Sequence, residues 1–420
     1  MGWVLFLLSL TDQPAIPRHP AFPSTLRQNS LAQMVPGVPR PGQPIGYQEA
    51  ARLVPSVTDA PPLPSPLDTS TAVPPRQPAA PVAQQAMPAM DRDESSGLPA
   101  MQFRGFSDVS YHVDNQNGTA NSFSLGQFNL FITSKLSDKL SVLAEAVVEA
   151  DQQNTVGIDL ERLLFRWASS DYLNVSVGRY HTAIGWYNTA YHHSSWMQTA
   201  VGRPFLFAFE DGGGILPVHN VGISLSGRIP GGELGLRYIA EVGNGRASRN
   251  RSAEAVQNVV DENSGKAVNL ALVSRPARLP GLEAGVSLYH DRLTPDGKPN
   301  VGETILAGHV VYQTTQVEWL NELVVIRHAA EGTGPVSHTT GFYTQLSKKF
   351  GAWRPYARYQ SVNAPSDDPV FPDVGLQRGP SVGLRYDVHD SVALKFQYDR
   401  TERRGLAGYN GFATQLSFTF

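Results

Sequence analysis

The feature that most constrains the fold is an alternation of apolar and polar residues, which recurs from Gln102 to the last residue, Phe420. In the segment SVGLRYDVH, for example, Val382, Leu384 and Tyr386 alternate with small or charged residues. Successive side chains of a strand point to opposite faces, so a period of two predicts strands with one apolar face. A helix would instead need apolar residues three and four positions apart.

About sixteen segments show this alternation. They run over residues 102–113, 122–135, 140–151, 156–168, 173–183, 219–229, 233–244, 266–275, 282–293, 303–313, 316–328, 339–350, 353–363, 378–389, 392–402 and 409–420. Most are longer than the strands of a soluble sandwich, which usually have about 5–6 residues. We predict an all-β fold, a transmembrane antiparallel β-barrel of about 16 strands. The alternative is a soluble all-β protein whose apolar faces share a core.

Aromatic residues and connection lengths favour the membrane barrel. Trp353, Tyr359 and Tyr386 lie near the ends of the apolar faces, as an interfacial girdle requires. Short connections follow the even-numbered segments and longer ones follow the odd-numbered segments. Bacterial outer-membrane barrels combine short periplasmic turns with long external loops. We therefore expect this chain in the outer membrane of a Gram-negative bacterium, with both termini in the periplasm.

The first hundred residues differ in composition from the rest of the chain. Of the 32 prolines, 19 precede Ala100, and the first ten residues, MGWVLFLLSL, resemble the core of a secretory signal. Proline fixes φ and removes a backbone donor, and few large apolar residues are available to bury. We expect a signal-like segment and a disordered proline-rich periplasmic linker over 1–100, followed by the barrel over 101–420.

The overall composition excludes several classes of protein. The 34 basic and 37 acidic residues nearly balance, which gives no electrostatic argument for nucleic-acid binding. There is no cysteine, so disulfides and cysteine-ligated metals are excluded. No apolar run is long enough for a transmembrane helix, which needs about 18 residues or more.

The connection over residues 184–218 is the longest inside the predicted barrel, and long loops in ordered domains are usually functional. Its aromatic residues can pack on the inner wall. The predicted constriction residues are His192, His193, Arg203, Glu210 and Asp211. They would set the size and charge preference of a pore. The alternative is an external loop folded over its own aromatic residues.

The histidines and serines of this loop suggest two chemical alternatives. His181, His192 and His193 could form a metal site, but their spacing matches no established motif. Ser194 and Ser195 follow two histidines, but no G-x-S-x-G pattern supports a hydrolase. We therefore predict no catalytic residue, no metal site, no cofactor and no enzymatic activity.

If the apolar faces meet lipid, the alternate positions line the lumen. The predicted basic lining residues are Arg162, Arg166, Arg228, Arg237, Arg354, Arg358, Arg385 and Lys395. The same rule places Glu145, Glu149, Glu233, Glu241, Glu283, Asp387 and Asp399 inside. The cations could form a path for anions, pair with the carboxylates, or create a transverse field with them. The sequence alone leaves these three arrangements open.

The region from Gln102 to Phe420 resembles the phosphate-selective porin family of Gram-negative outer membranes. The resemblance rests on the strand pattern, the motif VGRYHTAIGWYNTAYHH at 177–193 and the terminal phenylalanine. It implies sixteen strands, a homotrimer, and diffusion of anions through a pore lined by arginine and lysine. In general porins, the loop in the position of residues 184–218 folds into the lumen and narrows it.

We therefore expect a porin-like channel for passive diffusion of small hydrophilic solutes, with a preference for anions. Its partners would be outer-membrane lipid and the solutes themselves. The alternative function is a plugged structural barrel whose proline-rich arm tethers a periplasmic partner. The two functions differ in whether the lumen is open.

Overall fold

The computed structural model describes residues 101–116, 119, 121–150, 155–191, 194–209, 214–248, 259–332, 334 and 336–420. The signal-like segment and the proline-rich linker predicted over 1–100 lie outside the described residues.

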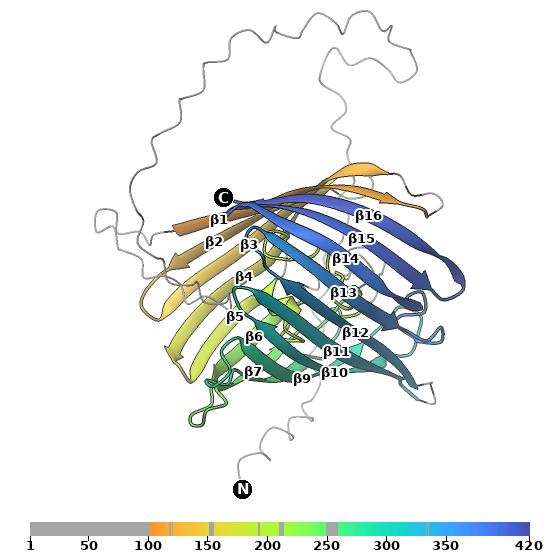
Figure 1. Cartoon of the computed structure of the whole chain (residues 1–420). Helices are drawn as coiled ribbons and strands as arrows, with labels where there is room; N and C mark the ends of the chain where they lie inside the picture. The colour runs from red at the N-terminus through yellow and green to blue at the C-terminus, as the bar shows by residue number, and fades with distance from the viewer. Residues whose placement is uncertain are drawn as a thin grey trace, which may run out of the picture. The chain divides into compact units, whose positions relative to one another are not determined.

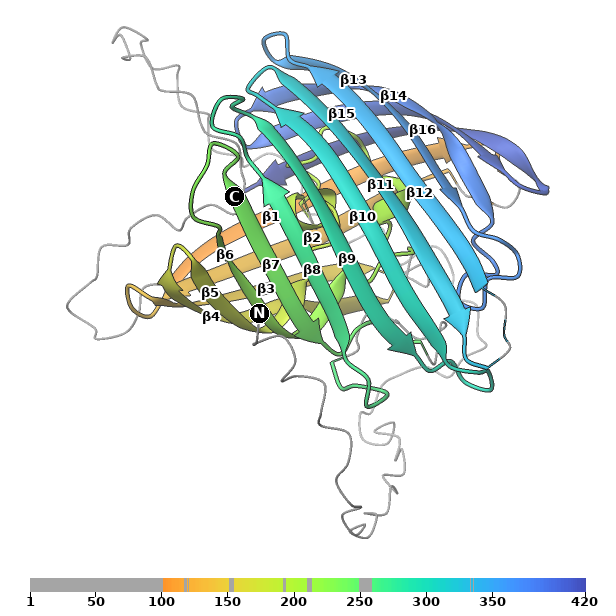
Figure 2. The same cartoon turned by 90° about the horizontal axis from the view of Figure 1, so that it is seen from below.

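Within these residues, sixteen strands form one closed antiparallel barrel (Figures 1 and 2). The strands are β1 (Met101–Asp114), β2 (Ser122–Lys135), β3 (Leu140–Ala150), β4 (Val156–Ser170), β5 (Leu173–His181), β6 (His219–Arg228), β7 (Leu236–Gly243), β8 (Ala267–Ser274), β9 (Leu282–Leu293), β10 (Val301–Gln313), β11 (Val317–Ala330), β12 (Val336–Lys348), β13 (Trp353–Asn363), β14 (Leu376–His389), β15 (Val392–Arg403) and β16 (Leu406–Thr419). Each strand pairs with its sequence neighbours, and β1 pairs with β16. The predicted all-β barrel is confirmed.

The barrel closes where the first and last strands meet. Residues 106–114 of β1 pair in register with residues 411–419 of β16. Next to this ladder, Gly105 N donates to Phe420 O at 2.8 Å and Phe420 N donates to Gly105 O at 3.0 Å. Closure leaves no unpaired strand edge, which is the condition for a sheet to exist in hydrocarbon. Phe420, directly after this closing strand, is 62% exposed, and its ring lies 5.8 Å from that of Phe128 on β2.

Large apolar side chains cover much of the outer face. Phe123, Leu125 and Ile158 are 77%, 71% and 75% exposed. Contact of such surface with water costs about 25 cal/mol per Å² relative to burial. On the adjacent strands β13 and β14, the rings of Trp353 and Tyr386 lie 4.3 Å apart between centroids. The outer surface therefore suits lipid, as the alternation predicted.

The inner face is not uniformly polar. The expectation that polar residues point inward and apolar residues point outward is wrong for β10. On β10, Val301, Ile305 and Val311 point inward and are 0–1% exposed, while the outward Leu306 is 56% exposed. Apolar residues thus occupy both faces of this strand. The reason is that the β5–β6 connection lies inside the barrel and provides these side chains with an apolar partner in place of water.

The longest connections lie at one end of the barrel, where residues 182–218, 244–266 and 364–375 join β5–β6, β7–β8 and β13–β14. The predicted alternation of short and long connections fails at β15–β16, which residues 404–405 alone join at this same end. At the other end, β2–β3, β4–β5 and β12–β13 are joined by residues 136–139, 171–172 and 349–352. We call this the short-turn end, and the opposite end the long-loop end. Met101 pairs with Ser134 beside the β2–β3 turn, so β1 begins at the short-turn end. Among the described residues, no helix is both long and apolar enough to span a membrane.

A test of the fold concerns Gly178 on β5. Its φ is 131°, and a Cβ at this position would lie 1.9 Å from Leu163 O on β4. That atom cannot move away without disturbing the β4–β5 ladder. We expect Gly178→Ala to lower the free energy of unfolding by about 2–4 kcal/mol, measured by urea unfolding in lipid vesicles.

The matched control is Gly302→Ala on β10, where the nearest atom to a new Cβ is Ala329 O at 3.8 Å. This change should alter the unfolding free energy by less than about 1 kcal/mol. Equal losses in the two variants would contradict the assigned backbone strain at Gly178.

Candidate functional site

The connection between β5 and β6, residues 182–218, lies inside the barrel in its described part (Figure 2). We call it the inner loop. It contains two short helical turns, α1 (Tyr187–Ala190) and η2 (Phe205–Phe207). Tyr187 stacks on Phe207 with 5.5 Å between ring centroids, and Tyr343 of β12 meets the Tyr187 ring edge-on at 5.9 Å. The loop therefore packs against one side of the lumen through aromatic contacts.

A buried carboxylate on β11 fixes the start of the inner loop. Glu322 accepts hydrogen bonds from Trp186 N at 2.6 Å and Tyr187 N at 2.9 Å, and from Tyr343 Oη at 2.7 Å. Glu322 is 2% exposed. Bonds to an ionised acceptor are shorter and stronger than neutral ones. This carboxylate thus satisfies two backbone donors that have no water to bind.

A second carboxylate on the same strand holds the middle of the loop. Glu318 accepts from Tyr191 Oη at 2.9 Å, from Thr199 Oγ1 at 3.2 Å and from Gln345 Nε2 at 2.8 Å. Burial, together with the nearby charge of Glu318, raises the pKa of Tyr191 well above its ordinary value. The Tyr191 hydroxyl therefore remains protonated and acts as a donor.

Cations on the opposite strands bind the carbonyl groups of the loop. Lys395 Nζ donates to Ser195 O at 2.5 Å and Ala200 O at 3.4 Å. Arg385 Nη1 donates to Trp196 O at 2.6 Å and Gln198 O at 3.0 Å. Arg358 likewise binds the carbonyls of residues 201–202. Three of the predicted lining cations are therefore used to hold the loop.

These contacts correct part of the predicted basic lining. Arg358 and Lys395 point inward, but at 3% and 0% exposure they do not line an open space. Arg354 also lies apart from the cavity, because its guanidinium binds Ser347 Oγ and Thr315 O. Periodicity places a side chain on the inner face but does not reveal whether a folded loop covers it.

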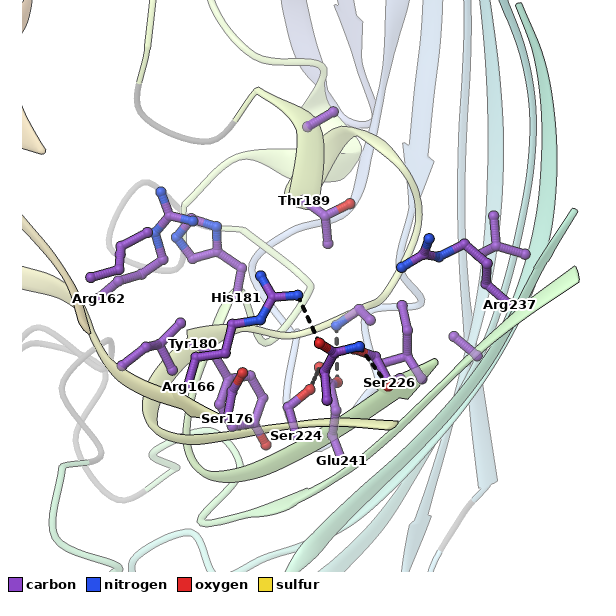
Figure 3. A pocket seen from close by; sticks show the side chains of 18 of the residues that line it. Arg162, Arg166, Ser176, Tyr180, His181, Thr189, Ser224, Ser226, Arg237 and Glu241 are labelled. Carbon is purple, nitrogen blue, oxygen red and sulfur yellow. Dashed lines mark hydrogen bonds between the residues drawn. The ribbon is translucent and has the colours of Figure 1, made fainter. Parts of the chain in front are cut away.

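An open cavity of about 1000 Å³ remains between the inner loop and the wall formed by β1–β10 (Figure 3). Small side chains on β5, β6 and β8 leave this space open, among them Ser176, Ser224, Ser226 and Ala271. Figure 3 shows Arg162 on the left, Arg237 on the right and the Arg166 side chain between them. Short-turn residues such as Lys139 and Asp171 line it as well, so the cavity reaches the short-turn end.

Seven basic residues line this cavity. Arg162, Arg166, Arg228 and Arg237 were predicted, whereas Arg104, Lys139 and Arg275 were not. The additional residues lie at the start of β1, in the β2–β3 turn and directly after β8. A strand pattern says little about turns, which is why Lys139 was missed. The inward parity of Arg104 with Gln102, and of Arg275 with Val273, could have indicated the other two.

Some of these cations are neutralised and others are not. Arg162 lies 2.5 Å from Glu145, Arg275 lies 2.8 Å from Glu283, and Arg228 lies 3.7 Å from Asp171. Within the described part of the chain, no carboxylate lies within 4.0 Å of the other four basic groups. These groups are Arg104, Lys139, Arg166 and Arg237. The cavity therefore contains both ion pairs and cations that have no carboxylate partner among the described residues.

The predicted constriction residues are only partly described. Arg203 donates through Nε to Phe207 O, and its guanidinium lies over the rings of Tyr187 at 5.3 Å and Phe209 at 4.2 Å. It thus stabilises the shape of the loop. His192, His193, Glu210 and Asp211 lie outside the described residues.

Of the histidine and serine candidates, His181 and Ser195 contact carboxylates of the wall, whereas His192 and His193 lie outside the described residues. His181 Nε2 lies 3.9 Å from Glu145, and His219 Nε2 lies 2.6 Å from Glu161. In the part of the chain that the structure describes, no group of three His, Asp or Glu side chains could hold a metal ion. Ser195 Oγ donates to Asp108 at 3.0 Å, which is a structural contact to the β1 wall.

A buried charge network lies at the long-loop end. His328 bridges Glu303 at 2.8 Å and Asp368 at 2.8 Å, and Arg246 Nε lies 3.2 Å from Glu303. Arg246 Nη2 also donates to Ile215 O at 2.6 Å. The network joins the inner loop, the β7–β8 connection and the β13–β14 connection to the wall. Each buried charge has a partner of opposite sign, which buried charges require.

Comparison of the sequence with protein-family models and with curated proteins gives no match. Solved structures share its fold. An anion-selective porin from Comamonas acidovorans matches with a TM-score of 0.56 at 12% identity, over 77% of this chain and 100% of that chain. The outer membrane channel DcaP of Acinetobacter baumannii matches with 0.52 at 10%, over 78% and 99%. A trimer form of OmpT, an outer membrane protein of Vibrio cholerae, matches with 0.51 at 9%, over 77% and 99%. At sequence identities of 9–12%, the similarity shows the barrel fold alone.

The role of Glu322 can be tested by hydrogen exchange. Glu322→Ala leaves two buried backbone donors and one hydroxyl without an acceptor, and each unsatisfied group costs about 1–3 kcal/mol. We expect exchange of residues 183–191 to accelerate by about tenfold or more, measured by mass spectrometry on the folded protein. The control is Glu331→Ala, which removes an exposed pair with Arg292 at 2.7 Å. Unchanged exchange in Glu322→Ala would refute the anchoring role.

A pH dependence follows from Asp368 in the β13–β14 connection. Burial alone would raise its pKa, but the hydrogen bond and charge of His328, with the N–H groups of Phe371 and Val370, lower it below the ordinary 3.8 overall. A carboxyl with a depressed folded pKa contributes stability above its unfolded pKa and loses it as pH falls through the folded value. Protection of residues 364–375 should therefore persist from pH 7 to below pH 3.8.

Hydrogen exchange of this connection as a function of pH measures the effect. Asp368→Asn should weaken protection by about tenfold at neutral pH and remove the acidic transition. Asp367→Asn is the matched control, because Asp367 is the exposed neighbour. Loss of protection near pH 5 in the unmodified protein would show that the carboxyl is not stabilised in its charged form.

Proposed function

We propose that this chain is an outer-membrane porin-like channel through which small hydrophilic solutes diffuse passively, with a preference for anions and without a covalent step. The observation that carries this proposal is the cavity with four cations that pair with no carboxylate among the described residues. Unpaired cations in a low-dielectric channel raise the local concentration of anions. The fold similarity to a protein described as an anion-selective porin also supports a preference for anions.

We propose that the inner loop narrows the passage. Trp186, Thr189 and Tyr191 of this loop line the cavity, and Arg162 and His181 line it from the strands (Figure 3). The narrowing is thus assigned to α1 and its neighbours, whereas Arg203 packs within the loop. A loop fixed by charge-assisted hydrogen bonds keeps a constant pore size.

Orientation and assembly are part of the same proposal. Outer-membrane barrels place short turns in the periplasm. The short-turn end, where β1 begins, would then face the periplasm and both termini would lie there. A homotrimer is supported by the fold similarity to OmpT in its trimer form.

We propose a general anion preference and not selectivity for phosphate. Four acidic side chains among the described residues, Asp138, Asp171, Glu241 and Glu283, line the same cavity as the arginines. These carboxylates offset part of the positive charge that a site selective for phosphate would need, whereas a general preference for anions requires only a net positive wall. Phosphate specificity remains a prediction of the sequence resemblance.

The experiment is single-channel recording of the full chain in a planar bilayer under a KCl gradient. Discrete conductance steps and a reversal potential of the sign for chloride are expected. Arg166→Gln combined with Arg237→Gln should lower the chloride-to-potassium permeability ratio by about two- to fivefold, because two charges leave the cavity wall.

The matched control is Arg278→Gln combined with Arg378→Gln, since both arginines form exposed pairs away from the cavity. The control should leave the permeability ratio unchanged. No conductance steps from folded protein, or a cation-selective reversal potential, would overturn the proposal.

A further inference from the structure

The unpaired cations of the cavity lie along an arc at the short-turn end. Arg104 belongs to β1, Lys139 to the β2–β3 turn, Arg166 to β4 and Arg237 to β7. All four line the cavity, and in the described chain none has a carboxylate within ion-pair distance. Arg166 has only an amide contact, to Asn174 Oδ1 at 3.4 Å. A ligand that binds there should therefore be negatively charged.

The chain itself enters the barrel at this arc. Met101, the first residue of β1, pairs with Ser134 one residue before the end of β2. The next inward residues, Gln102 and Arg104, already line the cavity. The segment that precedes Met101 is therefore attached at the rim of the basic cavity.

That segment carries acidic residues at a suitable distance. Residues 91–100 read DRDESSGLPA, with Asp91, Asp93 and Glu94 against a single arginine. Glu94 precedes Met101 by seven residues, which span at most roughly 24 Å. Arg166 lies three strand spacings from β1, or about 14 Å along the wall. The connecting segment is therefore long enough for the carboxylates to reach Arg166.

We propose that residues 91–94 bind in the cavity as a tethered counter-ion for Arg104, Lys139 and Arg166. The occupant is thus a segment of the same chain, selected by charge and by its attachment at the rim. A short tether gives the carboxylates an effective concentration of about millimolar. The segment competes with diffusing anions for the same cations, so it modulates the preference proposed above.

The test uses the full chain folded in lipid vesicles. Because the sequence contains no cysteine, only the two introduced cysteines can form a disulfide. Ser95→Cys keeps all three carboxylates and is combined with Ser141→Cys, a cavity position paired with Arg166. The control combines Ser95→Cys with Leu140→Cys. Leu140 is the adjacent residue and pairs with Trp167, which is 42% exposed on the outer face.

Disulfide formation with a copper–phenanthroline oxidant is followed by gel mobility. At low ionic strength, the Ser141 pair should form about tenfold faster than the Leu140 pair. The triple change Asp91→Asn, Asp93→Asn and Glu94→Gln should abolish this difference. So should about 1 M KCl, at which the screening length falls to about 3 Å.

Three results would overturn the proposal. They are equal rates for the two pairs, a preference that survives the triple change, and a preference that is insensitive to salt. The cross-linking readout does not depend on conduction. If the Ser141 pair forms faster but no conductance steps appear, the channel is refuted and the tethered counter-ion is supported. If conductance steps appear but the two pairs form at equal rates, the tethered counter-ion is refuted and the channel is supported.

Discussion

An irregular segment inside a barrel must find a partner for every backbone N–H and C=O that water no longer reaches. Here charged side chains of the wall supply many of those partners. Glu322 accepts from two N–H groups of the inner loop, and Lys395 and Arg385 donate to its carbonyls. Because such bonds are strong, a few side chains fix a loop of more than thirty residues. The loop then lies on the side that carries these charges, and the cavity remains on the other side.

The sequence predicted what depends on local periodicity. A strand in a closed barrel must alternate, so segments such as 378–389 revealed β14 with an error of two residues at one end. The same rule could not separate Arg385, which binds the loop, from Arg237, which lines the cavity, because both occupy inward positions. That distinction depends on where residues 182–218 fold. The apolar inward face of β10, matched to an aromatic-rich loop, was the signal that could have indicated it.

Which charges pair is harder to predict from the sequence, because pairing depends on the register between strands. Arg162 faces Glu145 across the β3–β4 ladder, whereas Arg237 faces Arg228 across the β6–β7 ladder. A shift of one residue in either ladder would move these side chains to the outer face. The register is a property of the closed sheet, which no single segment encodes. The identity of the unpaired cations therefore emerges only when all sixteen strands are in place.

Because the inner loop fills only one side of the lumen, substitutions on the two sides of the barrel have different effects. Inward residues on β10–β13 form the core between wall and loop, so most changes there affect folding. Inward residues on β5–β8, such as Ser176 and Ser226, border open space and have little packing to lose. Such a wall can acquire larger or differently charged side chains at little cost in stability. One half of this barrel can thus change the side chains that border its cavity while the other half preserves the fold.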